Sequence, residues 1–273
     1  MGVDISHDGS IIIYETSWTE NYVEKKKIDL DKLGWDRRIH YVTRQGKELW
    51  NKKILGTPYL SPDGKTIAIG KSAGEGRGLT ILDQNGNLLW KYISRETRNI
   101  VFSSDSNYIL FSGEGGLQLL DKSGNLLWAK DEERGAITSG AAYIVTEKRV
   151  YDKQANIVTE ILGRDIIISV DNSRAVYVYP NKVSLLTWPD KTVLKEYIFT
   201  FPGATAISRY GHYIVVGGKS AASSNNLFIF DTVTNTSWET KIESKFYFLL
   251  TDDGKYLLVI FINLNKLVFY QIY

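Results

Sequence analysis

Residues 119–131 read LLDKSGNLLWAKD, and the chain repeats this pattern. In it, two apolar residues lead to an aspartate, a polar turn follows, and a tryptophan comes after two more apolar residues. Asn-Gly and Ser-Gly pairs between apolar runs are typical of the tight turns that join antiparallel strands. The pattern therefore predicts a β-hairpin that recurs along the chain. Related stretches are ILDQNGNLLWKYI (residues 81–93), YVTRQGKELWNKK (41–53) and IFDTVTNTSWETK (229–241).

The recurring tryptophan predicts a packing contact between neighbouring units. Its side chain offers a large apolar surface, and its indole N–H needs a hydrogen-bond partner near a wet edge. A degenerate copy keeps Asp152 but has Thr159 at the tryptophan position, and residues 186–197, LTWPDKTVLKEY, keep only the turn and the apolar rhythm. The predicted structural repeat residues are Trp50, Trp90, Trp128 and Trp238, together with Asp83, Asp121 and Asp231.

A second element alternates with the first and consists of a short strand, a tight polar turn and a more apolar strand. YLSPDGKTIAIG (residues 59–70) and LLTDDGKYLLVIF (249–261) are two of its seven copies. Seven units in 273 residues give about 39 residues per unit, in the range of four-stranded propeller blades. We therefore predict an all-β fold, a seven-bladed β-propeller of four-stranded antiparallel blades that forms a single domain over residues 1–273.

The two ends of the chain raise the question of how such a ring closes. The chain begins in the first strand of the first unit and ends, at Tyr273, in the third strand of the seventh. The last blade is therefore expected to have three strands, unless residues upstream of the chain complete it. An outer strand without a neighbour exposes its backbone edge and favours association with another chain.

Two motifs resemble known propeller families. The pattern Asp-x-x-Gly-x-Leu-Leu-Trp of Asp83–Trp90 and Asp121–Trp128 resembles the repeat of quinoprotein-like propellers, including the outer-membrane-assembly lipoprotein type. LSPDGKTIAIG, residues 60–70, resembles the strand entry of WD40-type and Tol-B-type propellers. The resemblance covers the whole chain as architecture and implies a propeller, a fold that hosts many unrelated functions. Enzymatic quinoproteins hold a quinone cofactor with a metal ion, and many have vicinal cysteines, which this chain lacks.

Patterns that would indicate catalysis or metal binding are weak. His7, His40 and His212 do not have the paired spacing of a zinc site, so we expect turn and surface roles for them. The aspartates of the turns do not have EF-hand spacing, and hairpin chemistry explains them better. Residues 71–78, KSAGEGRG, lack the Gly-Lys-Ser/Thr ending of a phosphate-binding loop. We therefore predict no catalytic residues, no metal and no cofactor.

Composition limits the partners. A net charge of +2 is too balanced to indicate a nucleic-acid partner, and the absence of cysteine excludes disulfides. No signal peptide is recognisable at the N-terminus, and no apolar run approaches the roughly 20 residues of a membrane helix. We expect no membrane insertion, and the compartment stays open between the cytoplasm and an excised extracytoplasmic domain.

The main departure from the repeat is residues 17–38, SWTENYVEKKKIDLDKLGWDRR, which lengthen a strand connection of the first blade. Insertions on one face of a repeat protein often carry binding function. Alternatively, the aromatic residues of this segment simply pack on the first blade. Loops on the same side carry more basic residues than the opposite side does. The predicted partner-binding residues are Trp18, Tyr22, Trp35, Arg37, Arg38 and Arg77.

These observations favour a non-catalytic β-propeller that binds another protein, as a binding or scaffold module. Two alternatives stay open. One is a propeller that binds a small ligand or cofactor in a central channel, as a quinoprotein-like enzyme does. The other is an extracytoplasmic domain of an envelope or surface protein.

Overall fold

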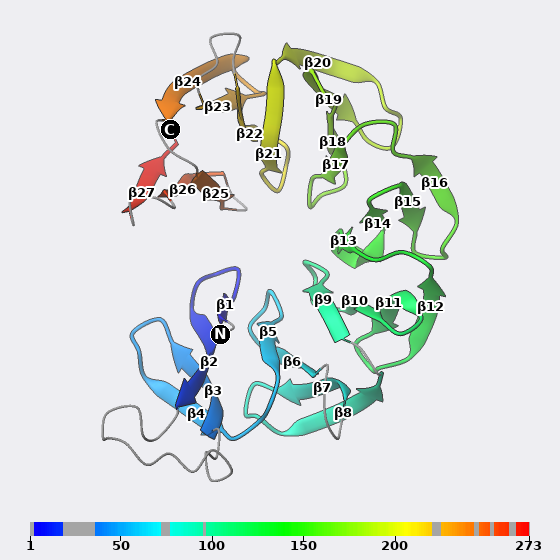
Figure 1. Cartoon of the computed structure of the whole chain (residues 1–273), viewed down its shortest axis with the longest axis vertical. Coiled ribbons are helices and arrows are strands. Elements are labelled where there is room, and N and C mark those ends of the chain that lie inside the picture. Colours follow the sequence, from blue (N-terminus) through cyan, green and yellow to red (C-terminus); the bar gives the residue numbers. More distant parts are fainter. Residues whose placement is uncertain are drawn as a thin grey trace, which may run out of the picture. The chain divides into compact units, whose positions relative to one another are not determined.

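The structure is a computed structural model that describes residues 3–18, 36–71, 77–94, 97–219, 225–242, 246–251, 254–261 and 266–272. Within these residues the chain is all-β, with a single 3₁₀ turn, η2 (Ser139–Ala141). Its strands form six four-stranded sheets and one three-stranded sheet in the described ranges (Figure 1). The predicted all-β fold of repeated four-stranded antiparallel units is confirmed, and this pattern is compatible with the blades of a propeller.

Each sheet is a meander whose strands lie side by side in chain order. The first three sheets contain β1 (Val3–Ile5), β2 (Ile11–Trp18), β3 (Asp36–Thr43) and β4 (Glu48–Lys52); β5 (Thr57–Leu60), β6 (Thr66–Lys71), β7 (Gly78–Asp83) and β8 (Leu88–Ile93); and β9 (Thr97–Phe102), β10 (Tyr108–Gly113), β11 (Gly116–Asp121) and β12 (Leu126–Lys130).

The remaining four sheets continue the pattern. They contain β13 (Gly135–Ile137), β14 (Tyr143–Thr146), β15 (Arg149–Asp152) and β16 (Ile157–Glu160); β17 (Asp165–Ile168), β18 (Arg174–Val178), β19 (Lys182–Thr187) and β20 (Val193–Ile198); β21 (Phe201–Ile207), β22 (Tyr213–Lys219), β23 (Asn225–Asp231) and β24 (Thr236–Ile242); and β25 (Phe246–Leu250), β26 (Tyr256–Phe261) and β27 (Lys266–Gln271).

By its internal contacts the chain divides into two compact units, Met1–Gly140 and Ala141–Tyr273. In the first unit, β1 contacts β5 and β5 contacts β9, so the first strands of successive sheets are neighbours. In the second unit, β17 contacts β21 and β21 contacts β25 in the same way. Each unit is therefore a series of sheets that meet along their first strands.

Side chains on both faces of the inner strands are buried, which explains why these strands are apolar at consecutive positions. In β6, Ile67 packs between the first and second sheets, whereas its neighbour Ala68 packs between the second and third. In the second unit, Val215 and Val216 of β22 likewise belong to two different apolar clusters. The cores therefore lie between sheets, and the second and sixth sheets each contribute to a core on either side.

A buried serine fixes the turn between the first and second strands of most sheets. The Ser61 hydroxyl donates to Asp63 Oδ1 at 2.7 Å and accepts from the Thr66 backbone N–H at 2.8 Å. This hydroxyl is completely buried, so its two hydrogen bonds remove the cost of an unpaired polar group. The same arrangement is found at Ser6, Ser103 and Ser169.

The turn between the third and fourth strands contains a residue in the left-handed region. Gly86 and Gly124 have φ values of +76° and +88° there, and the strand register shifts just beyond each turn. A left-handed glycine followed by a shift of one residue is the pattern of a G1-type β-bulge. The glycines of the sequence repeat are therefore required by the backbone of this turn. The corresponding positions in other sheets are Gly46, Ala155, Lys191 and Asn235.

The tryptophan of the fourth strand docks on this turn in the next sheet. Trp50 Nε1 donates to the carbonyl of Gln84 at 2.9 Å, and Trp90 Nε1 donates to the carbonyl of Lys122 at 2.9 Å. A Cβ atom at Gly124 would lie 2.8 Å from the Trp90 ring, so the indole lies directly on the glycine. One side chain thus supplies both apolar contact and a hydrogen bond between two sheets.

Polar residues make the corresponding contact where the tryptophan is missing. Thr159 and Lys195 pair with Val150 and Leu185, just as Trp90 pairs with Ile81. Lys191 Nζ donates to Thr159 Oγ1 at 2.7 Å, and Lys195 Nζ donates to Asn235 Oδ1 in the turn of the next sheet. The contact between an outer strand and the following turn is therefore kept while its chemistry changes.

The glycine–indole contact gives a first prediction. Gly124→Ala and Gly46→Ala both place a Cβ on a left-handed backbone, which costs about 1–2 kcal/mol. Only Gly124→Ala also forces a methyl group against Trp90, because the Cβ of Gly46 would meet nothing within 4 Å. We expect Gly124→Ala to lower the free energy of unfolding by roughly 1–3 kcal/mol more than Gly46→Ala does, as overpacking typically costs. Urea denaturation measures both, and equal losses would contradict the contact.

The turn carboxylates give a prediction for acid stability. Hydrogen bonds from the Ser6 hydroxyl and from the backbone and side chain of Ser10 lower the pKa of Asp8 to about 2. The pKa of Asp83 is also lowered, first by the backbone N–H of Asn87. Desolvation pushes the pKa of Asp121 up, but hydrogen bonds from Asn125 and the turn backbone outweigh it and lower that pKa below its ordinary value.

An aspartate in the unfolded chain has a pKa of about 3.9. A lower pKa in the folded chain therefore stabilises the folded state above that pH. This stability is lost as the pH falls through the folded pKa, here from about 4 toward about 2. We expect the thermal unfolding midpoint to drop over this range in calorimetry. Asp8→Asn keeps an acceptor oxygen but does not titrate, so its midpoint should depend less on pH. A pH dependence identical to that of the wild type would contradict this role of Asp8.

Candidate functional site

The candidate site lies on one face of the first sheet, at the base of the segment that interrupts the repeat. Tyr14 pairs with His40 and Thr16 pairs with Arg38 across β2 and β3. The opposite face carries Tyr41 and Trp50, which pack toward the second sheet. Because side chains alternate along a strand, the face with Thr16 and His40 points away from that core.

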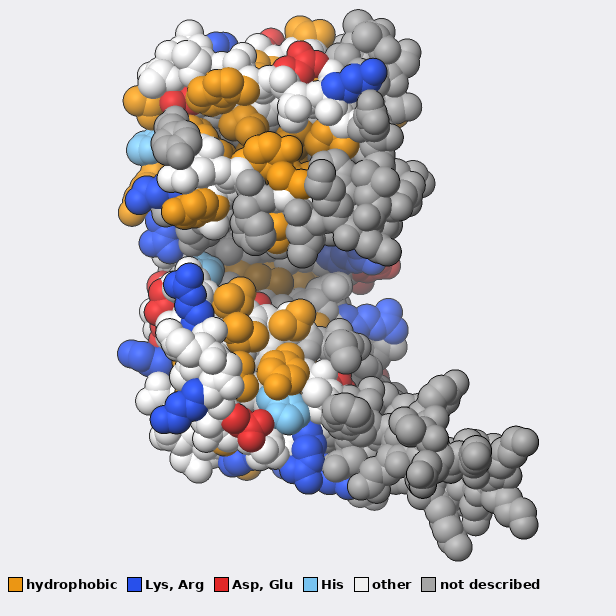
Figure 2. Space-filling view, turned by 90° about the vertical axis from the view of Figure 1, so that its left-hand side faces the viewer, with side chains coloured by type: hydrophobic (Ala, Val, Ile, Leu, Met, Phe, Trp, Pro, Cys, Tyr) orange, Lys and Arg blue, Asp and Glu red, His pale blue; other side chains and the backbone are white. Residues whose placement is uncertain are grey.

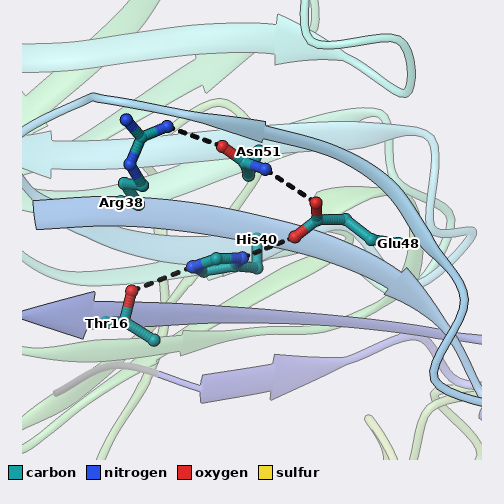
Figure 3. A network of polar contacts seen from close by, with 5 residues as sticks. All are labelled: Thr16, Arg38, His40, Glu48 and Asn51. Atoms are coloured by element: carbon teal, nitrogen blue, oxygen red, sulfur yellow. Dashed lines mark hydrogen bonds and ion pairs between the residues drawn. The ribbon is translucent and has the colours of Figure 1, made fainter.

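Five side chains from three strands form a continuous polar network on this face (Figure 3). The hydroxyl of Thr16 lies 2.9 Å from His40 Nε2, and His40 Nδ1 lies 2.7 Å from Glu48 Oε2. Asn51 Nδ2 donates to Glu48 Oε1 at 2.7 Å, and Arg38 donates from one terminal nitrogen to Asn51 Oδ1 at 2.8 Å. Each member is therefore held by at least one neighbour.

The imidazole of His40 is the fixed centre of this network. The ring of Tyr14 stacks on it, with centroids 4.8 Å apart and an angle of 8° between the planes. The side chain of His40 is 16% exposed, whereas that of Glu48 is 42% exposed. The network therefore runs from a half-buried ring to the solvent.

Glu48 is ionised at neutral pH. The hydrogen bond from His40 lowers its pKa most, and the amide of Asn51 lowers it further. An ionised carboxylate only accepts hydrogen bonds, so Nδ1 of His40 carries the proton that points at Glu48. In the neutral ring, Nε2 is then the acceptor for the Thr16 hydroxyl.

The order hydroxyl, imidazole and carboxylate is also that of a hydrolase relay. Such a relay additionally needs N–H groups that converge on the reacting oxygen. Thr16 lies inside β2, where neighbouring peptide groups follow an extended strand rather than a sharp turn or a helix N-terminus. Tyr14 stacks on the imidazole, and Asn51 links Glu48 to Arg38 by two hydrogen bonds. The network therefore forms a rigid polar surface on the strands.

The predicted partner-binding residues fall into three groups. Arg38 is part of the network, and Arg77 is exposed at the start of the second sheet's third strand, next to Gly78. Trp18 and Arg37 lie at the ends of β2 and β3, and their side chains are outside the described part of the structure, as are the whole residues Tyr22 and Trp35.

The ends of the predicted insertion belong to strands. Trp18 pairs with Asp36 and Ser17 pairs with Arg37, so the β2–β3 ladder takes in both ends of the segment 17–38. This narrows the interruption of the repeat to residues 19–35, which lie outside the described residues. His40, for which a turn or surface role was expected, lies within β3.

The predicted structural residues lie at repeated places. Trp50 and Trp90 dock on the following turn, Trp128 is half-buried in β12, and Trp238 in β24 is exposed. Asp83 and Asp121 accept backbone N–H bonds within their turns, at 2.8 Å and 2.8–3.0 Å respectively. Asp231 accepts from the backbone of Val233 and Thr234.

The described acidic and histidine side chains do not form a metal-binding cluster. Among the described residues, no group of three or more histidine, cysteine, aspartate or glutamate side chains could hold a metal ion. His7 lies in the first turn, where its backbone N–H donates to Pro62, and His212 lies near Tyr210, 6.0 Å between ring centroids. In the same part of the chain, no helix has the length and apolar character needed to cross a membrane.

The surface around the network is mixed in chemistry. Figure 2 views the molecule from the side on which β2 to β4 lie, and hydrophobic side chains are exposed there beside acidic and basic ones. A mixed surface of this kind, on a rigid sheet, offers both apolar contact and charged hydrogen bonds to a partner.

Comparisons with known proteins do not assign the chain to a family. No protein-family model matches the chain, and no curated protein matches it significantly. The resemblance of the repeat to quinoprotein-like and WD40-type propellers therefore has no support from these searches.

Sequence reasoning missed most of the network, although the repeat contained a signal. Glu48 occupies the position of Leu88 and Leu126 in the neighbouring repeats, because all three follow the bulge and pair with the residue before the turn. A charged residue that replaces leucine in one copy departs from the repeat as clearly as an insertion does.

Proposed function

We propose that this chain is a non-catalytic, protein-binding β-propeller of seven blades, with its binding surface at the base of the β2–β3 connection. The observation that carries the proposal is the fixed network from Thr16 to Arg38. A partner that binds side chains already held in place loses less conformational entropy on binding. Arginine is also among the residues that contribute most to protein interfaces.

The position of the network supports the same proposal. It lies where residues 19–35 interrupt the repeat, and connections that lengthen on a rigid scaffold are where binding surfaces commonly develop. Its charges are mixed, with Glu48 and Arg38 at either side of Asn51. A protein surface with complementary charges suits it better than a uniformly acidic polymer.

The seven-bladed ring is part of this proposal. Seven sheets follow one another in the described residues, and successive sheets in each unit meet along their first strands. Ile5 is 51% exposed, although Leu60, Phe102 and Ile168, which also precede a turn serine, are 5%, 9% and 8% exposed. In a closed ring the seventh sheet would cover Ile5 as preceding sheets cover the others. The resemblance to quinoprotein-like and WD40-type propellers is part of the same proposal.

Binding at the network is tested by capture from an extract of the source organism, with the full chain as bait. We expect Arg38→Glu to reduce retention of a specific partner by about tenfold or more, as loss of an interface arginine often does. The control is Arg44→Glu, which makes the same charge change in an exposed turn of the same sheet. Equal retention by both variants, or no specific partner, would overturn the proposed surface.

Ring closure is tested by the cost of truncating Ile5. If the seventh sheet covers it, Ile5→Ala should lower the free energy of unfolding by roughly 2–4 kcal/mol, as for a buried core residue. Leu60→Ala, at the equivalent and buried position, is the reference for that cost. A loss of less than about 0.5 kcal/mol, typical of an exposed site, would argue against closure over this residue.

A further inference from the structure

An open cavity lies between the fifth and sixth sheets, both in the second unit, at their outer strands β20 and β24 (Figure 1). Its volume is about 490 Å³, which is in the range of small-molecule sites. The lining combines aromatic rings with hydroxyl and carboxylate groups. It includes Tyr197, Phe199, Phe228, Phe230, Ser237 and Glu239.

The cavity lies where the residue that joins two sheets has changed. In the first unit, Trp90 fills the corresponding place and lies on Gly124 of the following turn. Lys195 has the matching position in β20. Its Nζ donates to Asn235 in the turn between β23 and β24, and Lys195 is not part of the cavity lining. A lysine stem occupies less of the gap between two sheets than an indole does, which leaves room beside Tyr197.

Four aromatic rings form the apolar part of the lining. Phe199 lies edge to face against Phe228, with centroids 4.8 Å apart and an angle of 88° between the planes, and Tyr197 packs on Phe230. Phe199 and Phe230 are buried, whereas Tyr197 and Phe228 are half-buried, so a ligand can reach the latter two. The faces of such rings attract cations and the edges of other rings. Lys195 shows this attraction within the chain, because its Nζ lies 5.4 Å from the centroid of the Tyr197 ring.

Glu239 places a carboxylate beside these rings. It pairs with Phe228 across β23 and β24, on the face that is turned to the fifth sheet. The amide of Asn226, which is 4% exposed, donates to Glu239 Oε1, so a buried group holds the carboxylate in position. A carboxylate can accept about four hydrogen bonds, so Glu239 can also accept donors from a ligand. Glu196 borders the cavity as well, but its Oε1 accepts from Lys182 at 2.6 Å.

We propose that this cavity binds a small arylalkyl ammonium ion. The ammonium group donates to Glu239, and the aryl group lies against Phe228 and Tyr197. Both parts of the wall favour this chemistry, because the carboxylate selects a cation and the aromatic rings attract a cation as well as a further ring. The cavity volume suits a small molecule. This inference concerns the second unit and goes beyond the protein-binding function proposed for the network of the first sheet.

Three ligands of similar shape test the proposal on the unchanged full chain. We expect saturable binding of 2-phenylethylammonium in isothermal titration calorimetry. The neutral 2-phenylethanol and the anionic 3-phenylpropionate keep the aryl group without the positive charge. Each should bind about tenfold more weakly or worse, as loss of a hydrogen bond between charged groups costs. Lack of saturable binding of 2-phenylethylammonium, or equal affinity for the three ligands, would overturn the proposal.

A matched pair of variants assigns the charge recognition to one carboxylate. Glu239→Gln keeps an acceptor oxygen for Asn226 and should weaken binding of 2-phenylethylammonium by about tenfold or more, with the affinity for 2-phenylethanol unchanged. Glu147→Gln makes the same charge change at an exposed residue outside the cavity lining and should bind as the wild type does. Wild-type affinity of Glu239→Gln, or an equal loss in both variants, would contradict the site. Should Glu239→Gln fail to fold, the ligand series on the unchanged chain decides.

Discussion

The contact of an outer-strand side chain with the left-handed turn of the next sheet sets the spacing between neighbouring sheets. In the first unit this contact is an indole on a glycine, with a hydrogen bond from Nε1 to a turn carbonyl. It requires both partners, since only a residue without a Cβ allows the ring to approach the backbone so closely. The apolar side chains between the sheets can then pack at the density of a protein interior. In the second and third sheets an aspartate, Asp83 or Asp121, accepts backbone N–H groups and keeps the turn in the required shape.

In the second unit the same strand position contacts the turn of the following sheet, although the residue at that position differs. Thr159 and Lys195 replace the indole by a hydroxyl and an ammonium group. The Thr159 hydroxyl accepts a hydrogen bond from Lys191 in the turn of the following sheet, and Lys195 donates one to Asn235 in the turn of the sheet after that. The turn changes in parallel, because Lys191 and Asn235 take the left-handed position that glycine has in the first unit. A polar pair gains less free energy from burial than an indole does. These contacts therefore fix the relative orientation of the two sheets more than they add apolar contact. Trp238, at the same place in β24, is 46% exposed.

The polar network on the first sheet does not take part in these contacts between sheets. Its members occupy positions that the repeat fills with other residues, and they bond to one another instead of to a following sheet. A group of polar side chains that is fully connected and only partly exposed is rigid, which suits a surface for recognition.

The sequence by itself determined the all-β class, the strand–turn rhythm and the positions of the glycines, because these depend on residues close together in the chain. Alternation of side chains and the need for positive φ are local properties. Only the tertiary structure decided which side chains meet. Thr16 lies 24 residues from His40, and a bulge beyond Gly46 is what brings Glu48 to the imidazole. Lys195 contacts Asn235, which lies 40 residues further along the chain. Such contacts depend on register and on the distance between sheets, which no local pattern fixes.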